Sequence, residues 1–505
     1  MMLNTNLQTK NSEMKNLPEV KIGIVAVSRD CFPIELSEKR RKNVVKVCKE
    51  KKVPVTEINK IVENENDIPA ALLELVKNKV NALVVYLGNF GPEGPLSMLA
   101  QKFNGPVMFV AAAEETGNDL YSGRGDAFCG LLSASYNAGL RSINPYMPEY
   151  PVGRPEEITE MIGEFIPVAR IILGIRKLKI FTFGPRPFDF NTLYAPLKPL
   201  MNMGVEVMEN SELDLYELFN KAKNNPEVPG VLKNMEKELG SANKYPGILP
   251  KLAQYEVALT SFFKENLGTS EYGVFANKCW PAFQTSFGFV PCYVNSRLAA
   301  RGIPVACEAD IYGALSEYML TCATDFPATI LDVNNTVPLD MYEKAKEIIG
   351  DYTHNDLFMG FHCGNTCSSC MTNYEMKYQL IMHRLLEPDK EPDITRGTIE
   401  GTIGAGDMTL FRFQCTPENE LKVYVAEGEV LDMDPKTFGS TGIIAIKEMG
   451  RFYRHVLLAK KFPHHAGVGF KHAGKALYSA SRLLGVDDVS FNLPKGMYYP
   501  TENPF

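Results

Sequence analysis

Short apolar runs rich in β-branched residues alternate with helix-like stretches before residue 326, and this alternation restricts the fold more than any other feature. Lys21–Ser28, Asn81–Asn89 and Pro106–Ala113 are predicted strands, and a stretch with helical apolar spacing runs from about Glu35 to Lys51. Parallel strands need a crossover between them and are buried on both faces, which makes them continuously apolar. The pattern therefore predicts a doubly wound parallel sheet covered by helices.

The same pattern restarts after a segment rich in proline and glycine, Pro145–Pro155, which is typical of a domain boundary or an exposed connection. The predicted strands of this second region are Leu178–Gly184, Gly204–Asn210, Tyr272–Trp280 and Ile303–Asp310. A second doubly wound α/β domain is therefore expected in tandem with the first.

The pattern changes after residue 326. Gly397–Cys415 and Leu421–Asp432 alternate apolar and polar residues, with glycines at the expected corners, which is typical of an antiparallel sheet or small barrel. The predicted organisation is a polar leader (1–20), a flavodoxin-like α/β domain (21–160), a second α/β domain (161–325) and a mainly antiparallel β domain with helices (326–505).

Composition excludes several classes of function. The chain has 505 residues, 45% hydrophobic and 22% charged, with a net charge of −7 and no basic block. A nucleic-acid partner is therefore not expected, because it needs a basic face. No run approaches the roughly 18–20 apolar residues that span a bilayer, and the polar N-terminus lacks a signal-like segment. The 11 scattered cysteines indicate no disulfide framework. We expect a cytoplasmic protein.

Two carboxylates stand directly after apolar runs. Glu308 follows IPVAC and Asp332 follows PATIL, and a helix predicted over Ile311–Leu320 joins them. Side chains at the ends of buried strands often form the sites of α/β proteins, so both carboxylates are candidates for one site. The alternative is helix capping, because Glu308 and Asp310 lie just before the helix.

A pair of adjacent histidines, His464 and His465, is the second candidate feature. Neighbouring side chains point in different directions, so one of the two would ligate while the other orients or packs. Two carboxylates and one imidazole suit Mn²⁺ or Mg²⁺ better than zinc. A surface or capping role is the alternative for a histidine pair.

Cys363, Cys367 and Cys370 have C-x3-C-x2-C spacing, which holds iron–sulfur clusters in radical enzymes. The motif lies late in the chain, Ser369 stands where an aromatic residue is usual, and no barrel of alternating strands and helices follows. An iron–sulfur enzyme is therefore an alternative rather than the main hypothesis, and a zinc site that includes His362 is another.

Four further residues are candidates for contacts with a substrate. Arg29 and Asn89 follow predicted strands of the first domain, where turn chemistry is the alternative. Trp280, the single tryptophan, follows a strand of the second domain and is a candidate floor for a sugar site, with core packing as the alternative. His362 follows an apolar run and is a candidate hydrogen-bond partner for a substrate hydroxyl.

The segments around the two carboxylates resemble a known family. IPVACEADIYGALSEYML followed by ATILDVNN is similar to the core of the L-fucose isomerase and L-arabinose isomerase superfamily. The resemblance extends from about Lys21 over nearly the whole chain. Further segments that resemble the fucose-isomerase-related branch are SRDCFP, YLGNFGPE, RGDAFCG, NKCWPAF, FHCGNT and GTIEGTIGAGDMTLFR.

The resemblance implies a metal-dependent aldose–ketose isomerase that works through an enediol, with a hydride shift as the competing mechanism. Glu308 and Asp332 match the family's manganese ligands and acid/base groups, and the third ligand falls on His465, with His464 as the alternative. Mn²⁺ is the expected ion, with Mg²⁺ or Co²⁺ as other divalent choices.

The family's enzymes are hexamers in which the first domain of a neighbouring subunit closes the pocket, so Arg29 and Asn89 would act across an interface. The resemblance leaves several sugars open: L-fucose, D-arabinose, L-arabinose or a substituted hexose such as a sulfosugar. A non-catalytic sugar-binding protein is the remaining alternative, although it would need no metal triad.

Overall fold

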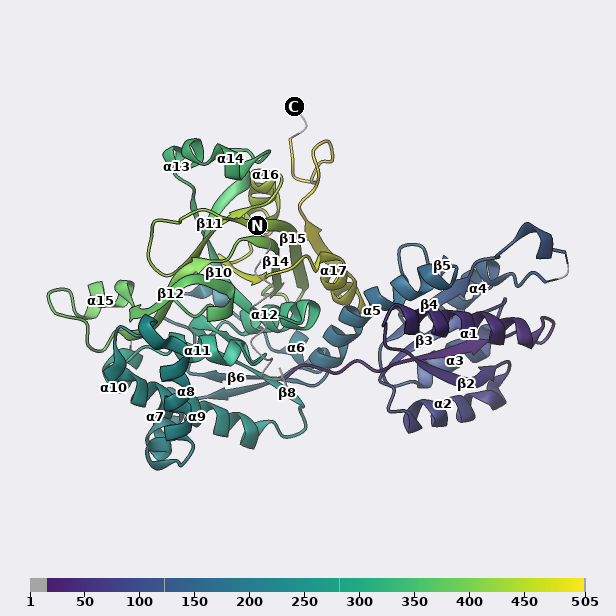
Figure 1. Cartoon of the computed structure of the whole chain (residues 1–505), viewed down its shortest axis with the longest axis horizontal. Coiled ribbons are helices and arrows are strands. Elements are labelled where there is room, and N and C mark those ends of the chain that lie inside the picture. The colour runs from purple at the N-terminus through teal and green to yellow at the C-terminus, as the bar shows by residue number, and fades with distance from the viewer. Residues whose placement is uncertain (1–15, 122, 281, 504–505) are drawn as a thin grey trace. The chain divides into compact units, whose positions relative to one another are not determined.

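The computed structural model describes residues 16–121, 123–280 and 282–503, which form two compact units (Figure 1). The smaller unit comprises Pro18–Leu173 and Ser479–Gly485, and the larger unit comprises the rest. The division passes through two helices, α5 (Pro155–Ile175) and α17 (Gly474–Leu483). The three-domain division at residues 160 and 325 stays a prediction. In the described part of the chain, no helix is long and apolar enough to cross a membrane.

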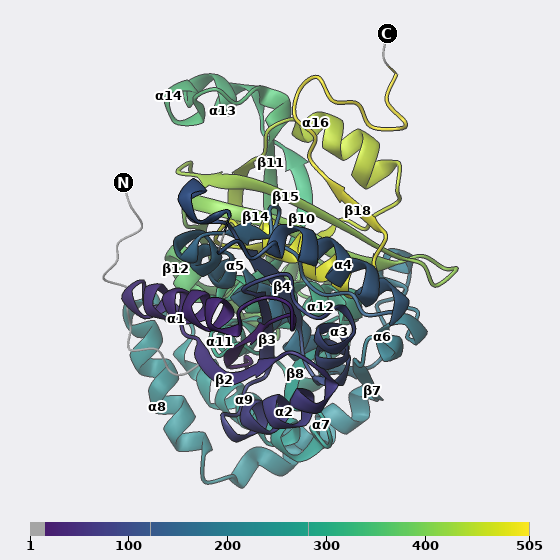
Figure 2. The same cartoon turned by 90° about the vertical axis from the view of Figure 1, so that its right-hand side faces the viewer.

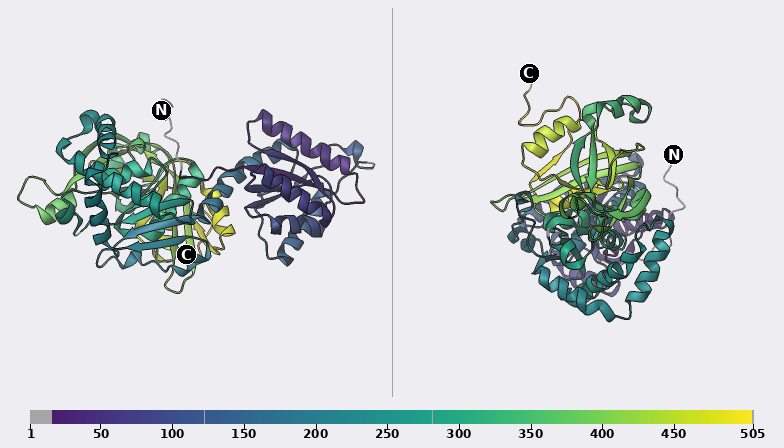
Figure 3. Two further views of the ribbon diagram at one scale, coloured as in Figure 1. Left: turned by 90° about the horizontal axis from the view of Figure 1, so that it is seen from below. Right: turned by 90° about the vertical axis from the view of Figure 1, so that its left-hand side faces the viewer.

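The smaller unit is built on a five-stranded parallel sheet with the order β2-β1-β3-β4-β5. Its strands are β1 (Ile22–Val27), β2 (Thr56–Val62), β3 (Ala82–Leu87), β4 (Val107–Ala112) and β5 (Val152–Gly153). Its helices are α1 (Ile34–Glu50), α2 (Ile68–Lys77), α3 (Glu93–Lys102), α4 (Ala127–Leu140) and most of α5. Helices lie on both sides of the sheet (Figure 3, left), which confirms the predicted doubly wound arrangement.

Edge position explains the strand that the sequence pattern missed. β2 lies at the edge of the sheet and mixes polar and apolar residues, whereas β1 and β3 are buried along their whole length. A strand that is partly exposed does not need the continuous apolar run that marks a central parallel strand.

The larger unit begins with a second parallel sheet in the order β7-β6-β8-β9. Its strands are β6 (Leu178–Phe183), β7 (Glu206–Asn210), β8 (Tyr272–Asn277) and β9 (Val305–Ala306). The helices of this region are α6 (Lys198–Asn202), α7 (Glu212–Lys221), α8 (Val228–Leu239), α9 (Leu249–Asn266), α10 (Phe283–Phe287), α11 (Cys292–Ala299) and α12 (Ile311–Thr324). Asn16, from the expected polar leader, is buried against it and hydrogen-bonds Gly273 and Gly302.

The rest of the larger unit is a closed antiparallel barrel of six strands in the order β16-β11-β10-β17-β14-β15, which β15 completes by pairing with β16 (Figure 2). These strands are β10 (Ala328–Thr336), β11 (Leu357–His362), β14 (Gly406–Cys415), β15 (Leu421–Leu431), β16 (Ser440–Ala445) and β17 (His465–Gly469). Three strands extend the sheet beyond the barrel: β12 (Met371–Tyr378), β13 (Arg396–Ile403) and β18 (Asp488–Phe491). The remaining helices are α13 (Leu339–Lys344), α14 (Lys346–Ile349), α15 (Leu380–Leu386), α16 (Met449–Phe452) and α17 (Gly474–Leu483). The predicted antiparallel C-terminal region is confirmed, and it is a closed barrel.

Helix α12 lies between the parallel sheet and the barrel (Figure 1). It packs on β6 and β8 on one side and on β14 and β17 on the other, and nearly all its residues are buried. A helix enclosed on all sides must be apolar around its circumference, which agrees with the sequence IYGALSEYMLTCAT. This packing brings the end of β9 next to the barrel strands.

Candidate active site

Neighbouring antiparallel strands of the barrel bring one carboxylate and one imidazole together. Asp332 on β10 lies directly opposite His465 on β17, and opposite Phe361 on β11, the residue before His362. Side chains opposite each other in an antiparallel pair have Cβ atoms about 4.5–5.5 Å apart. The expectation that Asp332 follows the end of a strand is wrong, because β10 continues to Thr336. The apolar run stops at Leu331 because the strand becomes more exposed from Asp332 onward.

Glu308 reaches the same place from the parallel sheet. It stands in a tight turn after β9 with φ 62° and ψ 28°, and the next residue, Ala309, also has a positive φ of 56°. Left-handed conformations are unfavourable for residues with a Cβ and persist where the surrounding structure enforces them, often at functional sites. The turn directs Glu308 towards the barrel.

The three side chains converge closely. His465 Nε2 lies 3.1 Å from Glu308 Oε2 and 3.6 Å from Asp332 Oδ1. His464 Nε2 lies 4.0 Å from Asp332 Oδ1. His465 is almost fully buried, whereas the side chain of His464 is 40% exposed. The two candidate metal-ligating groups in the described residues are Glu308–His464–His465 and Asp332–His362–His465. His465 belongs to both.

Asp310 orients His465 from behind. Its carboxylate accepts a 2.8 Å hydrogen bond from His465 Nδ1 and two hydrogen bonds from Arg412, at 2.5 and 2.9 Å. It also caps α12 through the N–H of Gly313, where a Cβ would lie only 2.4 Å from Asp310 Oδ2. Because Nδ1 donates to a carboxylate, Nε2 is the ring nitrogen directed at Glu308 and Asp332, the arrangement of many metal-ligating histidines.

Sequence reasoning treated Asp310 as a possible cap and missed Arg412. The cap is present, and the same carboxylate also serves the site. Arg412 is fully buried in β14, within the apolar run MTLFRFQC. A charged residue inside such a run must be paired, which was the available signal. The sequence did not indicate Asp310, 102 residues away, as the partner.

The two carboxylates titrate differently. Burial raises the pKa of Glu308, but His465 beside it outweighs burial, so the pKa lies below its usual range. Burial, together with the charge of Glu308, raises the pKa of Asp332 to about 6 despite the opposing effect of His465. Burial lowers the pKa of His465, but the carboxylates of Asp310 and Glu308 outweigh it and raise the pKa to about 10. The site thus contains one strongly ionised carboxylate and one that can hold a proton near neutral pH.

His362 is a neutral donor in this arrangement. It is buried, and burial lowers its pKa to about 4. Its Nδ1 accepts a 2.9 Å hydrogen bond from the backbone N–H of Cys363, so in the neutral ring the proton is on Nε2. Ligation of a metal through Nε2 would require a neutral ring with its proton on Nδ1, which faces the N–H of Cys363. His362 can instead donate a hydrogen bond, as the predicted contact with a substrate hydroxyl requires.

The converging atoms have the properties of a cation site. His465 Nε2 and Asp332 Oδ1 are buried and make no well-directed hydrogen bond among the described residues, although Nε2 lies within ion-pair distance of Glu308. Buried polar atoms normally make hydrogen bonds, so two facing atoms without one indicate a position where a further ligand binds. Two carboxylate oxygens and one imidazole nitrogen suit a hard divalent ion. The residues therefore fit the predicted metal.

One aromatic ring lies between Trp280 and the histidine pair. Phe190, in the loop after β6, packs edge-on against Trp280 at 5.4 Å and against His464 at 6.0 Å between ring centroids. Trp280 is partly exposed, so core packing does not cover the whole side chain. Its role as the floor of a sugar site stays a prediction.

Arg29 and Asn89 lie in the smaller unit, after β1 and β3. Asn89 is fully buried, and its side-chain amide bonds to Ser28, Pro33 and the backbone N–H groups of Arg29 and Gly91. Arg29 is half-exposed, stacks over Phe90 at 4.8 Å and lies 3.7 Å from Glu93. Asn89 therefore shapes the turn that presents Arg29.

The cysteines offer no comparable site. All eleven are free thiols. Cys367 lies 3.0 Å from Ser369 Oγ, and Cys370 contacts the carbonyl of Pro327 at 3.9 Å. Within residues 16–121, 123–280 and 282–503, neither metal-ligating group contains a cysteine. The iron–sulfur alternative gains no support from this arrangement.

The chain is similar to known proteins over most of its length. A family model described as "Fucose/sulfoquinovose isomerase, N-terminal domain" matches residues 23–176, and one described as "L-fucose isomerase, C-terminal domain" matches residues 360–491. The sulfoquinovose isomerase of Alkalicoccus urumqiensis is 26% identical over 433 residues, which cover 84% of this chain and 87% of the relative. That of Priestia aryabhattai is 22% identical over 473 residues, 92% of this chain and 97% of the relative.

These matches, on this combination of parallel sheets and barrel, define an aldose–ketose sugar isomerase. The chain belongs to the fucose isomerase-related family, in the L-fucose isomerase and L-arabinose isomerase superfamily. The enzyme class and family predicted from the sequence are confirmed. A non-catalytic sugar-binding protein does not agree with them.

Proposed function

We propose that Glu308, Asp332 and His465 hold a divalent cation, Mn²⁺ first and Mg²⁺ or Co²⁺ as alternatives, and that the enzyme interconverts its sugars through an enediol. The observation that supports this most directly is the pair of buried atoms without a well-directed hydrogen bond, His465 Nε2 and Asp332 Oδ1, beside the ionised Glu308. We assign His465 as the ligand rather than His464, because it is the buried histidine and Asp310 orients its ring.

Isomerisation moves a proton between C1 and C2 of the sugar. A bound divalent cation would polarise the carbonyl and stabilise negative charge on the neighbouring oxygens. One carboxylate takes the proton from carbon as the other supplies a proton to oxygen, which requires separated pKa values. Glu308, with its lowered pKa, suits the base, and Asp332, with a pKa of about 6, suits the acid. The Nε2–H of His362 hydrogen-bonds a substrate oxygen. A hydride shift is the mechanism to be tested against this one.

The substrate that we propose is sulfoquinovose, a hexose with a sulfonate on C6. The relatives matched over most of their length carry the name sulfoquinovose isomerase. L-Fucose, D-arabinose and L-arabinose are the competing sugars within the family. In this proposal Trp280 packs against the sugar, because Phe190 connects it to His464 beside the carboxylates.

We also propose a homo-oligomer, a hexamer by family resemblance, in which Arg29 acts at a neighbouring subunit's site and Asn89 contributes by shaping the turn that presents Arg29. Helix α4 supports self-association, because its fourteen residues contain no charge. Phe128, Leu132, Tyr136 and Leu140 form a stripe with a spacing of four, each 59–70% exposed. Such a stripe is typical of an interaction surface. A cytoplasmic location agrees with eleven free thiols, which a reducing compartment preserves.

The test is turnover with and without metal. The protein is stripped with chelator, Mn²⁺ is restored, and ketose formation from each candidate aldose is followed by NMR. Deuterium from the solvent appears at the exchanged carbon if an enediol forms, whereas a hydride shift carries the substrate hydrogen across. We expect Glu308→Gln to lower kcat about 1,000-fold or more, as removal of a group used in the transition state does.

The matched control is Glu343→Gln, which changes an exposed glutamate of the same unit whose carboxylate, among the residues that the structure describes, pairs only with Lys346 at the surface. It should leave kcat unchanged. If the stripped protein is fully active, or if Glu308→Gln retains activity, the metal site and the assigned roles are wrong.

A further inference from the structure

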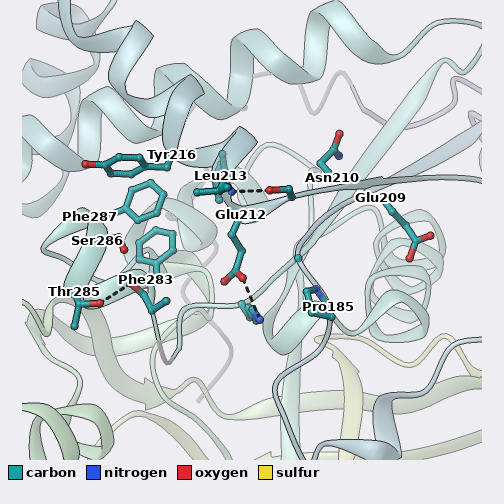
Figure 4. Close-up of a pocket in the computed structure, with 15 residues that line it drawn as sticks. Pro185, Glu209, Asn210, Glu212, Leu213, Tyr216, Phe283, Thr285, Ser286 and Phe287 are labelled. Atoms are coloured by element: carbon teal, nitrogen blue, oxygen red, sulfur yellow. Dashed lines mark hydrogen bonds and ion pairs between the residues drawn. The ribbon is translucent and has the colours of Figure 1, made fainter.

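A cavity of about 950 Å³ opens at the carboxyl ends of β6, β7 and β8 in the larger unit (Figure 4). In doubly wound sheets, ligands bind outside the carboxyl ends of the strands at the point where the strand order reverses. In the order β7-β6-β8-β9, the chain runs from β6 to β7 on one side of β6 and then to β8 on the other side. The strand order therefore reverses between β6 and β8. Gly184 and Pro185 follow β6 and Lys278 follows β8, and all three line the cavity.

The turn that carries Lys278 leaves the sheet beside the turn that carries Glu308. Strands β8 and β9 pair in parallel with Ala276 beside Ala306, and Lys278 and Glu308 stand two residues after these partners, in the turns that follow the two strands. Adjacent strands are about 4.8 Å apart, so the two turns begin side by side at the same edge of the sheet. A sugar bound at Glu308 is therefore next to the turn whose Lys278 lines the cavity.

Lys278 is a buried cation with little local compensation. Its side chain is only 8% exposed, and its single ion pair within the described residues is with Glu212 Oε2, at 3.4 Å. An ammonium group has three donors, and a buried charge is costly unless it is paired and hydrogen-bonded. Glu212 lies between Phe283 and Pro185 and is itself 40% exposed (Figure 4). A single ion pair leaves other donors of the Lys278 ammonium group available to an anion.

The other wall of the cavity is aromatic. Phe283 stacks on Phe287 with ring centroids 4.1 Å apart, and Tyr216 meets Phe287 edge-on at 5.2 Å. Rings of this kind offer an apolar surface to the C–H groups of a sugar while the cation holds a charged substituent. The cavity thus combines a cation for the charged substituent with an apolar wall for the C–H groups of the sugar.

We propose that this cavity receives the end of the sugar remote from the reacting carbons, and that Lys278 selects a sulfonate substituent there. The inference rests on the proposed isomerase function and assigns the residue that distinguishes an anionic from a neutral hexose. A C6 phosphate shares the same tetrahedral oxygen chemistry, so the experiment includes both anions.

The experiment measures equilibrium binding by calorimetry to metal-stripped protein and, separately, kcat/KM after Mn²⁺ is restored. The ligands are sulfoquinovose, glucose 6-phosphate and glucose. For Lys278→Met we expect the preference for sulfoquinovose over glucose to fall about 10- to 100-fold, the usual loss for a hydrogen bond to a charged group. Lys278→Arg should retain most of that preference. Lys344→Met removes an exposed lysine paired only with Asp340 and is the matched control with no change.

An unchanged preference in Lys278→Met would overturn the inference, as would equal losses for sulfoquinovose and glucose. A preference for glucose 6-phosphate over sulfoquinovose in the wild-type chain would overturn the assignment of a sulfonate. Failure of the proposed function is a separate result: binding of sulfoquinovose that depends on Lys278, without ketose formation, would support this cavity and overturn the isomerase proposal for that sugar.

Discussion

In the smaller unit, Asn89 follows β3 at the carboxyl edge of a parallel sheet, and in the larger unit Glu308 follows β9 at the same kind of edge. Asn89 is buried with its hydrogen bonds made to its own turn. Glu308 faces Asp332 Oδ1 and His465 Nε2, which make no well-directed hydrogen bond in the described part of the chain. A polar residue at the end of a strand therefore does not define a site by itself. What distinguishes Glu308 is that it faces a second carboxylate and an imidazole from other strands.

The barrel explains why Glu308 belongs to a cluster of side chains while Asn89 bonds only within its own turn. In the larger unit, α12 packs on both the parallel sheet and the barrel, so the turn after β9 lies against β10 and β17. Those strands add a second carboxylate and an imidazole, and Arg412 on β14 holds Asp310 behind them. Within the smaller unit, the turn after β3 is closed by its own amide group. The following predictions test this contrast, from the largest expected effect to the smallest.

Arg412→Met should lower the free energy of unfolding by about 3–5 kcal/mol, because it leaves the buried carboxylate of Asp310 without its cation. Urea denaturation and hydrogen exchange in α12 and β14 measure this loss. Arg154→Met is the control in the smaller unit, since its ion pair with Glu157 is exposed and should contribute less than about 1 kcal/mol. Equal losses in the two variants would contradict the assigned role of the buried pair.

Asn89→Ala should destabilise the smaller unit by about 1–3 kcal/mol, because the N–H groups of Arg29 and Gly91 lose their acceptor. Hydrogen exchange reports the local loss, and calorimetry with Mn²⁺ should show unchanged metal affinity. The exposed Asn78, which only hydrogen-bonds the carbonyl of Glu74, is the control when changed to alanine. A stable Asn89→Ala protein would show that the turn does not depend on this amide.

Metal affinity should rise with pH, by up to about tenfold per unit between pH 7 and 9. In the metal-free protein the pKa of His465 is raised to about 10, so the ring carries a proton at neutral pH that the metal must displace. The gain should level off once pH exceeds this pKa. Calorimetry in buffers of different ionisation enthalpy counts the proton released. An affinity that is independent of pH would exclude His465 as a ligand.

Arg29→Ala should change the free energy of unfolding by less than about 1 kcal/mol, because the side chain is half-exposed and its ion pair with Glu93 is 3.7 Å long. If the side chain reaches a neighbouring subunit's sugar, kcat/KM should fall about tenfold while kcat for a saturating substrate changes less. Steady-state kinetics and sedimentation measure the two effects. An unchanged kcat/KM would remove Arg29 from the proposed site.

Much of the fold followed from local patterns. Strands β1, β3, β4, β6 and β8 begin and end within three residues of the bounds predicted from their apolar runs. The alternation of apolar and polar residues after residue 326 indicated antiparallel strands, but it did not predict whether their sheet closes into a barrel. Closure depends on the pairing of β15 with β16, whose contacts are set by the twist of the whole sheet.

The sequence by itself determined which residue types are available: two carboxylates after apolar runs, one histidine pair, and a family resemblance that predicted the enzyme class. Only the tertiary structure decided that Asp332 stands mid-strand opposite His465, that Asp310 orients this ring, and that Lys278 lines a cavity at the carboxyl ends of β6 and β8. The physical reason is that periodicity reports burial along one segment, whereas a site depends on which unpaired atoms of distant segments face each other once the core has packed.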